Sequence, residues 1–178
     1  MKAIIEEVLN HFSGVLTEEH YPRGYLLHRE QTICKHIYFV TSGAIRSFYL
    51  KDGKDITAHF AIDLGVLSAA DSFIFNRPSR YNLEVLEDST VFRMSRQEME
   101  NFLEQHPRYE HTARLFVEEL YMDLVDRVEI LMFYSAQERY EALIAQNPDI
   151  IQRVSLGHIA SFLGITQETL SRVRATPR

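Results

Sequence analysis

The chain has one cysteine, Cys34, among its 178 residues, and this scarcity excludes an intrachain disulfide and any cluster held by several cysteines of one chain. We expect this lone thiol to serve as a small packing residue. Long apolar runs are also missing: no segment approaches about 18 uncharged apolar residues, and the N-terminal segment MKAIIEEVLNHF is acidic where a signal peptide needs an apolar run. The sequence therefore predicts a soluble cytoplasmic protein that does not enter a membrane.

Motifs for catalysis and metal binding are missing as well. The eight histidines show no HExxH motif and no paired metal-ligand spacing, and the chain has no GxSxG elbow, P-loop or GxGxxG run. With 46% hydrophobic and 25% charged residues, the composition is that of an ordinary globular protein. We therefore expect no metal, no cofactor and no enzymatic activity.

The net charge of −6 argues against a generally basic, nucleic-acid-binding surface, but the charge is unevenly distributed. From residue 150 onward, the single acidic residue is Glu168, and it is outnumbered by Arg153, Arg172, Arg174 and Arg178. The C-terminal end is therefore the basic part of the chain, as a DNA-contacting end should be.

The stretch LGHIASFLGITQETLSRVRA, residues 156–175, has the spacing of two short helices packed across a tight turn. Leu156, Ile159, Ala160 and Leu163 share one face of the first helix, and Gly164 follows as a residue that can take positive φ. Ala160 is small, as a close crossing of two helices requires. The first helix is therefore predicted to end at Gly164.

The second helix is predicted to begin after Thr166, a suitable N-cap residue, with Ile165 filling the turn. Leu170 and Val173 then form its buried stripe. A small residue, a glycine four positions later, and apolar residues one, six and nine positions beyond that glycine are typical of the DNA-binding helix-turn-helix. The alternative is a helical hairpin inside a helical domain, with its charged residues solvated.

In a helix-turn-helix, the polar face of the second helix reads base edges in the major groove. Arginine suits guanine, glutamine suits adenine, and glutamate accepts from cytosine. Hydroxyl groups and backbone amides at helix starts hold phosphates. The expected DNA-binding residues are Ser155, Thr166, Gln167, Glu168, Thr169, Ser171, Arg172 and Arg174.

Upstream, a short amphipathic helix over residues 2–12 precedes a region of short β-rich runs. We expect strands at residues 25–28, 36–41, 44–50, 56–62, 81–86 and 90–94. Asp52 and Gly53 lie between two of these runs and give a strong hairpin signal, because both residues tolerate positive φ. Many short strands at close spacing predict a β-roll or barrel.

The β-rich region is predicted to end at a helix. Ser95 and Glu98 have the spacing of a capping box, and Met94 and Met99 that of a hydrophobic staple, so a helix should start at Arg96.

After Pro107, residues 108–147 contain no glycine or proline and carry a broad apolar face. The central stripe is Ala113, Val117, Leu120, Leu124, Val128 and Leu131, widened by Phe116, Tyr121, Met122, Val125 and Met132. One barrel cannot cover so wide a face, so we expect a second copy of the chain to pack on it. The alternative is a core helix buried on all sides in a compact monomer.

The order of elements resembles the CRP/FNR family of bacterial transcription regulators over essentially the whole chain. The resemblance is carried by HIYFVTSGAIRSFYLKDGKDITAHF, by the LEDS turn at residues 86–89 and by the terminal GITQETLSRVR. It implies an α+β fold with an N-terminal double-stranded β-helix (β-roll or jelly roll) over residues 1–105, a dimerisation helix over 106–134 and a helix-turn-helix domain over 135–178. It also implies a homodimer through residues 109–133, a two-fold-symmetric operator in double-stranded DNA, and RNA polymerase as a further partner.

Two departures from the family pattern matter. Family members that bind cyclic nucleotides use a Gly-Glu pair for the ribose and an arginine for the phosphate, but these positions fall on Ala69, Ala70 and Ser79. With Arg77, Arg80 and Tyr81, these residues mark the expected ligand pocket, which Phe73, Phe75 and Tyr81 should partly fill. We therefore predict no binding of cyclic AMP or cyclic GMP. The sequence also lacks the wing that usually follows the recognition helix, which predicts weaker DNA binding.

Two functions follow from these observations. The favoured one is a sequence-specific DNA-binding transcription regulator that does not respond to cyclic nucleotides. The alternative is a ligand-binding or protein-interaction module whose DNA-binding domain is vestigial.

Overall fold

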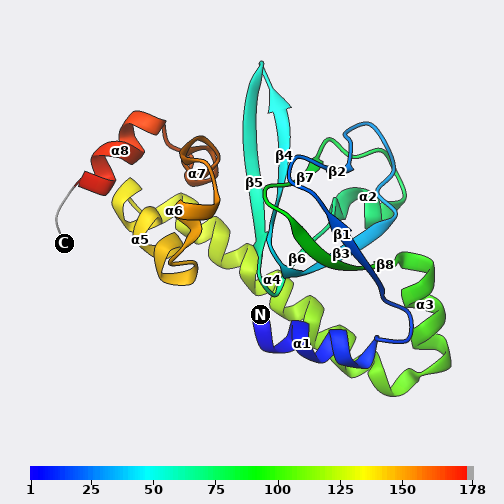
Figure 1. The fold of residues 1–178 in the computed structure, drawn as a ribbon. Helices are drawn as coiled ribbons and strands as arrows, with labels where there is room; N and C mark the ends of the chain where they lie inside the picture. The colour runs from blue at the N-terminus through cyan, green and yellow to red at the C-terminus, as the bar shows by residue number, and fades with distance from the viewer. Residues whose placement is uncertain (176–178) are drawn as a thin grey trace.

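A computed structural model describes residues 1–175 of the chain, and Figure 1 shows a β-roll, a long helix beneath it and a cluster of short helices at the C-terminal end. Arg178, counted above in the basic end of the chain, lies outside the described residues. The predicted α+β fold with a β-roll is confirmed. No helix within residues 1–175 is both long and apolar enough to cross a membrane.

The β-roll consists of two four-stranded antiparallel sheets, with strand orders β1-β8-β3-β6 and β2-β7-β4-β5. All six predicted runs form strands, but two further strands, β1 and β6, escaped prediction. The strands are β1 Thr17–Tyr21, β2 Leu26–His28, β3 His36–Ser42, β4 Ala44–Lys51, β5 Lys54–Ile62, β6 Gly65–Leu67, β7 Asn82–Val85 and β8 Ser89–Ser95.

The alternation of side chains along β3 divides the core into two parts. Tyr38 and Val40 point between the sheets and pack in one cluster with Ile45 and Leu83 of the second sheet. Phe39 points the other way, toward the helices. Because successive side chains of a strand point to opposite faces of the sheet, β3 contributes apolar residues both to the interior of the roll and to its outer face.

The turn between β4 and β5 has the predicted hairpin geometry. Asp52 and Gly53 both take positive φ, 53° and 75°. Because this twist matches that of the flanking strands, β4 and β5 pair along their whole length and project as a long arm (Figure 1).

Helices cover the outer face of the first sheet. They are α1 Lys2–His11, α3 Arg96–Gln105, the short 3₁₀ helix η1 Pro107–Tyr109 and α4 Glu110–Phe133. The capping box at the start of α3 is confirmed: Ser95 Oγ accepts from the backbone amide of Glu98 over 3.2 Å, and Glu98 Oε2 accepts from the amide of Ser95 over 2.7 Å. Met94 and Met99 pack in the same outer cluster.

The apolar stripe of α4 divides between two neighbours. Ala113, Phe116 and Leu120 pack against α1 and the roll. The rest of the helix leaves large apolar side chains exposed, so the alternative of a core helix buried on all sides is wrong. These exposed residues are Val117, Tyr121, Met122, Leu124, Val128, Leu131, Met132 and Phe133.

Short helices complete the chain after α4. A second capping box, formed by Ser135 and Glu138, starts α5 Ala136–Gln146. There follow α6 Ile150–Arg153, α7 Leu156–Leu163 and α8 Gln167–Ala175, while the six-residue α2 Ala70–Phe75 lies between β6 and β7. The helices α5 to α8 share one apolar cluster with Ala44, Ile62 and Leu86 of the roll, so the C-terminal region packs directly on the β-roll.

Candidate DNA-binding face and ligand pocket

The helices α7 and α8 form the predicted helix-turn-helix. Gly164 ends α7 with φ 69°, and Thr166 Oγ1 accepts from the amide of Thr169 over 3.1 Å at the start of α8. Ala160 is buried where the helices meet, and Leu170 and Val173 are buried as predicted. Leu156, the first residue of α7, is 37% exposed, whereas Ile159 and Leu163 on the same face are buried.

The opposite face of α8 is polar and open to solvent. Gln167, Glu168, Ser171, Arg172 and Arg174 are all exposed. Hydroxyls of the expected DNA-binding set also make contacts within the protein: Thr169 Oγ1 contacts Thr166 Oγ1 over 3.0 Å and accepts from Arg172 Nη2 over 3.4 Å.

Two further expected DNA-binding residues, Ser155 and Thr166, lie at helix starts. Ser155 Oγ accepts from the amide of His158 and caps α7, while Thr166 caps α8. Both residues are exposed. The side-chain amide of Gln167 lies against Gly157, where an added Cβ would come within 2.6 Å of its Nε2, so the absence of a side chain at residue 157 makes room for it.

Arg153 does not belong to the basic DNA-facing end in which the sequence placed it. Its guanidinium forms ion pairs with Asp63 at 2.5 Å and with Glu87 at 2.5 Å, both on the β-roll, and with Asp149 at 3.2 Å. The hydrogen bond to Arg153 holds the pKa of Asp63 below its usual value. Arg153 is therefore an anchor between the helical region and the roll.

A second anchor joins α7 to the arm of the β-roll. Ser161 Oγ donates to the backbone oxygen of Asp55 over 3.1 Å and accepts from the amide of Thr57 over 3.0 Å, so α7 covers part of the edge strand β5. Nearby, burial and then the charge of Arg46 lower the pKa of His158. Nothing local in the sequence signals these contacts, because their partners are about 100 residues apart.

The expected nucleotide pocket is organised by an internal hydrogen bond. Ser79, at the position of the family's phosphate-binding arginine, is buried and donates from Oγ to Asp71 Oδ1 over 2.8 Å. The guanidinium of Arg77 lies over the ring of Phe75, and that of Arg80 over the ring of Tyr81.

The aromatic residues near this site behave differently from one another. Tyr81 packs against the interior cluster of the roll, as expected. The prediction was wrong for Phe75, which is 67% exposed, and Phe73 packs in the outer cluster under the helices. Helix α2 ends in a left-handed residue, Asn76, and its last turn carries Phe75 to the surface.

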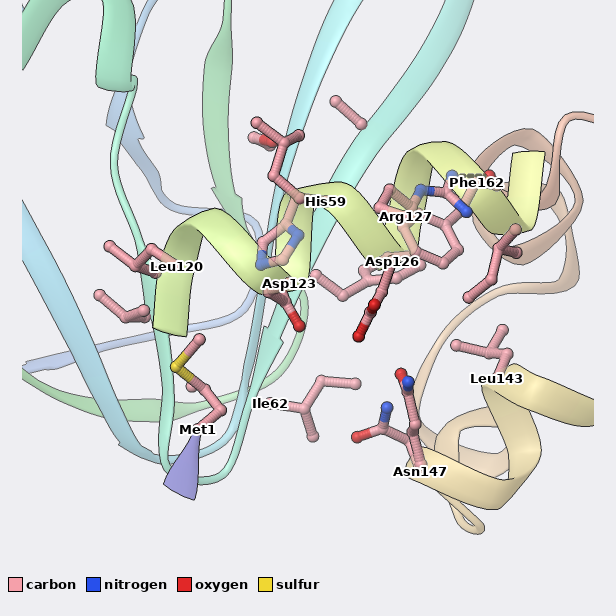
Figure 2. Close-up of a pocket in the computed structure, with 18 of the residues that line it drawn as sticks. Met1, His59, Ile62, Leu120, Asp123, Asp126, Arg127, Leu143, Asn147 and Phe162 are labelled. Atoms are coloured by element: carbon pink, nitrogen blue, oxygen red, sulfur yellow. Dashed lines mark hydrogen bonds between the residues drawn. The ribbon is translucent and has the colours of Figure 1, made fainter. Parts of the chain in front are cut away.

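A groove of about 820 Å³ runs between the roll, α4 and α5 (Figure 2). Of the six residues expected in the ligand pocket, Ala70, Arg80 and Tyr81 line it, whereas Ala69, Arg77 and Ser79 are not among its lining residues. Residues of α4 also line this groove, and the sequence analysis did not place them there. Charged residues within an otherwise apolar helix face were a signal that could have identified them.

Charged side chains of α4 meet the roll inside this groove. His59 points from β5 toward Asp123 (Figure 2), and burial lowers the pKa of the imidazole while the Asp123 carboxylate opposes that effect. Arg127, one turn further along α4, lies beside Phe162 of α7. Within residues 1–175, no group of three or more histidine, cysteine or acidic side chains is placed to hold a metal ion.

A β-roll joined by a long helix to a helix-turn-helix defines the architectural class of this chain. A family model, the cyclic nucleotide-binding domain, matches residues 18–106, and the chain belongs to this family. A comparison with curated protein sequences found no significant match.

Solved structures share the fold over most of this chain. FixK2 from Bradyrhizobium japonicum aligns with a TM-score of 0.76 and 21% identity, covering 90% of this chain and 83% of that one. A CooA mutant from Carboxydothermus hydrogenoformans aligns with a TM-score of 0.66 and 20% identity, covering 94% and 77%. A protein from Eubacterium rectale assigned to the CRP/FNR family gives 0.67 and 20%, covering 92% and 79%. The order of elements predicted from the resemblance is therefore confirmed.

Proposed function

We propose that this protein is a homodimeric, sequence-specific DNA-binding transcription regulator. The observation that carries the proposal is the geometry of α8, whose apolar residues are buried against α7 while its polar face stays open to solvent. A capped helix N-terminus with Gln167, Glu168 and Arg172 on its outer face suits entry into the major groove. Contact with RNA polymerase stays a prediction.

The exposed stripe of α4 supports the homodimer. Its members alternate at spacings of four and three residues, which is the heptad pattern of a two-stranded coiled coil. They are exposed by 38% to 64%, far more than large apolar side chains of a monomer usually are when they line one helix face. The stripe consists of Val117, Tyr121, Leu124, Val128 and Leu131.

The residues at the expected phosphate and ribose positions support the absence of a response to cyclic AMP or cyclic GMP. A cyclic nucleotide needs a positive partner for its phosphate, but Ser79 is neutral and bonded to the Asp71 carboxylate, which would repel that phosphate. At the ribose position, Ala70 has no group that could bind the hydroxyl. Isothermal titration with either nucleotide should give no binding heat, and micromolar affinity would contradict this part of the proposal.

The DNA-binding role is tested with the proposed base-reading arginine. After selection of an operator from random duplexes, Arg172→Ala should weaken binding by about 1 to 3 kcal/mol and relax the preference at one base pair per half-site. Arg23→Ala removes the same charge from an exposed turn of the β-roll and is the matched control. Unchanged affinity and selectivity in Arg172→Ala would show that this face of α8 does not read DNA.

The salt dependence of binding separates the proposal from a vestigial DNA-binding domain. Phosphate contacts give a steep negative slope of log affinity against log salt, which fluorescence anisotropy can follow on random duplex between about 50 and about 300 mM salt. A vestigial domain would give almost no slope.

A further inference from the structure

The C-terminal end of α7 is held by two arginines from outside the helix-turn-helix. Arg127 of α4 donates from Nη2 to the backbone oxygen of Phe162, and Arg139 of α5 donates from Nη1 to that of Leu163 over 3.1 Å. Carbonyls in the last turn of a helix lack intrahelical donors and carry partial negative charge. Both guanidinium groups therefore bind α7 at its most negative end. We call Arg127 and Arg139 the arginine pair.

Arg139 also binds the end of α4. Its Nη2 donates to the backbone oxygen of Leu131 over 2.8 Å, and its Nε donates to that of Tyr134 over 2.9 Å. One planar group thus joins the last turn of α4 to the last turn of α7. Lysine has a single flexible ammonium group and cannot reproduce three bonds in these fixed directions.

Arg127 makes its second contact with an aromatic ring. Its guanidinium carbon lies 3.7 Å from the centroid of the Phe162 ring, and that ring lies 5.0 Å from the ring of Phe60 on β5. Figure 2 shows the arginine alongside the ring at one end of the groove. The contact ties α4, α7 and the arm of the β-roll together at one point.

The charge of Arg127 is held without an acidic partner, since the ion pairs of residues 1–175 do not include it. Burial, and to a smaller extent the charge of Arg139, lower its pKa to about 10. A cation in such surroundings depends on the Phe162 carbonyl and ring for its stability.

The position of α7 determines the position of α8. Ile159 and Leu163 of α7 share a buried cluster with Leu170 of α8, and the connecting turn at Gly164 is short. An Arg139 nitrogen would lie 3.4 Å from a Cβ added at Gly164, so the arginine pair reaches the turn itself.

We propose that the arginine pair consists of positioning residues that fix recognition helix α8 relative to the dimer helix α4. The inference rests on the proposed function, since α4 carries the dimer contact and α8 the DNA contact. In a homodimer, the pair would set the separation and angle of the two α8 helices, and through them the half-site spacing that the protein accepts.

The first test measures this separation without DNA. A spin label is placed on α8 through Ser171→Cys in a Cys34→Ser background, and the distance between the labels of the two copies is measured by double electron–electron resonance. The unchanged arginine pair should give one narrow distribution, near the roughly 34 Å that separates successive major-groove faces. Arg127→Met and Arg139→Met should broaden or shift it.

The matched control is Arg114→Met, because Arg114 is an exposed arginine of α4 whose partners His111 and Glu118 lie on the same helix. It should leave the distribution narrow. Arg139→Lys keeps the charge and loses the three directed bonds, so it should behave like Arg139→Met. Narrow, unshifted distributions in both methionine variants would overturn the proposal, and so would the lack of any interchain distance in the unsubstituted protein.

The second test uses operators whose half-sites are moved apart or together by one or two base pairs, each step being about 3.4 Å along the duplex. The unsubstituted protein should prefer one spacing by about tenfold or more, while either methionine variant should lose most of that preference. Affinity for a single half-site should stay unchanged, because the reading face of α8 is intact.

The two tests separate the failure of this inference from failure of the proposed function. If the methionine variants change the label distance but the protein does not bind DNA, the proposed regulator function is refuted, and the positioning role of the arginine pair stands. Normal operator binding with an unchanged spacing preference would refute the role of the pair alone. Circular dichroism verifies that each variant is folded. Because the substitutions are made at two independent positions, the inference can still be tested if one variant fails to fold.

Discussion

The dimer contact can be tested at one residue in the middle of the exposed stripe of α4. Leu124 is 60% exposed in the single chain, and its neighbours at heptad spacing are Tyr121 and Val128. Full burial of a leucine side chain stabilises by about 1.5 to 3 kcal/mol. Pairing would cover the part still exposed, so each copy should contribute about 1 to 2 kcal/mol.

Because the stripe pairs with itself in a two-fold dimer, Leu124→Ala acts twice. The expected loss is about 2 to 4 kcal/mol per dimer, which raises the dimer dissociation constant about 30-fold or more. Sedimentation equilibrium over a range of protein concentrations measures this constant directly, and circular dichroism should show unchanged helix content, since Leu124 contributes little to the fold of the single chain.

The control is Glu129→Ala, an exposed residue of α4 that lies off the stripe. It should leave the dissociation constant within about twofold. A dimer whose constant responds equally to both substitutions, or to neither, would refute the assignment of this stripe to the dimer interface.

Three further predictions concern stability, each followed by urea unfolding. Ser95→Ala removes the capping box with Glu98 and should cost about 1 kcal/mol. Arg153→Met leaves the carboxylates of Asp63 and Glu87 without their partner and should cost about 1 to 3 kcal/mol, whereas a neutral result would mean that the anchor is not needed. Because Arg153 lowers the pKa of Asp63, that stabilisation is complete above the carboxyl's ordinary pKa of 3.8 and is lost as the pH falls below it, and Arg153→Met should flatten this acid dependence.

Local patterns in the sequence were sufficient for much of the fold. The hairpin at Asp52, the capping box at Ser95 and the turn at Gly164 depend on the backbone preferences and side-chain groups of a few adjacent residues. Such features are readable because their causes lie within one turn of the chain. The polar face of α8 was predictable for the same reason.

Two strands were missed because their sequences lack the strand pattern. In β1, Glu18, Glu19 and His20 lie on an edge strand that pairs only with β8 within the described residues. An edge strand tolerates charged side chains, so β1 does not show the alternation of apolar and polar residues that marks a strand. Strand β6 has three residues, and it begins at Gly65, a residue type with low strand preference.

The placement of contacts between distant segments could not be predicted. Periodicity gave the width of the apolar face of α4 but not its neighbours, and it therefore grouped Leu120, which packs on the β-roll, with Leu124, which is exposed. The ion pairs of Arg153 and the contact of Ser161 with β5 join segments far apart in the chain, and a count of local charge assigned Arg153 to DNA for that reason.

The apolar and charged residues of α4 are unevenly distributed because different faces of this helix lie in three different environments. Phe116 faces the β-roll, Leu124 faces solvent on the proposed dimer side, and Arg127 reaches the end of α7. Since neighbouring faces of one rigid helix cannot move independently, a rotation that improved packing on the roll would displace the dimer stripe and the contact with α7 together. A ligand in the groove would touch the same helix, because Asp123 and Arg127 both line it. A displacement of α4 would therefore reach α7 through Arg127, in addition to the direct contact of α7 with β5 through Ser161.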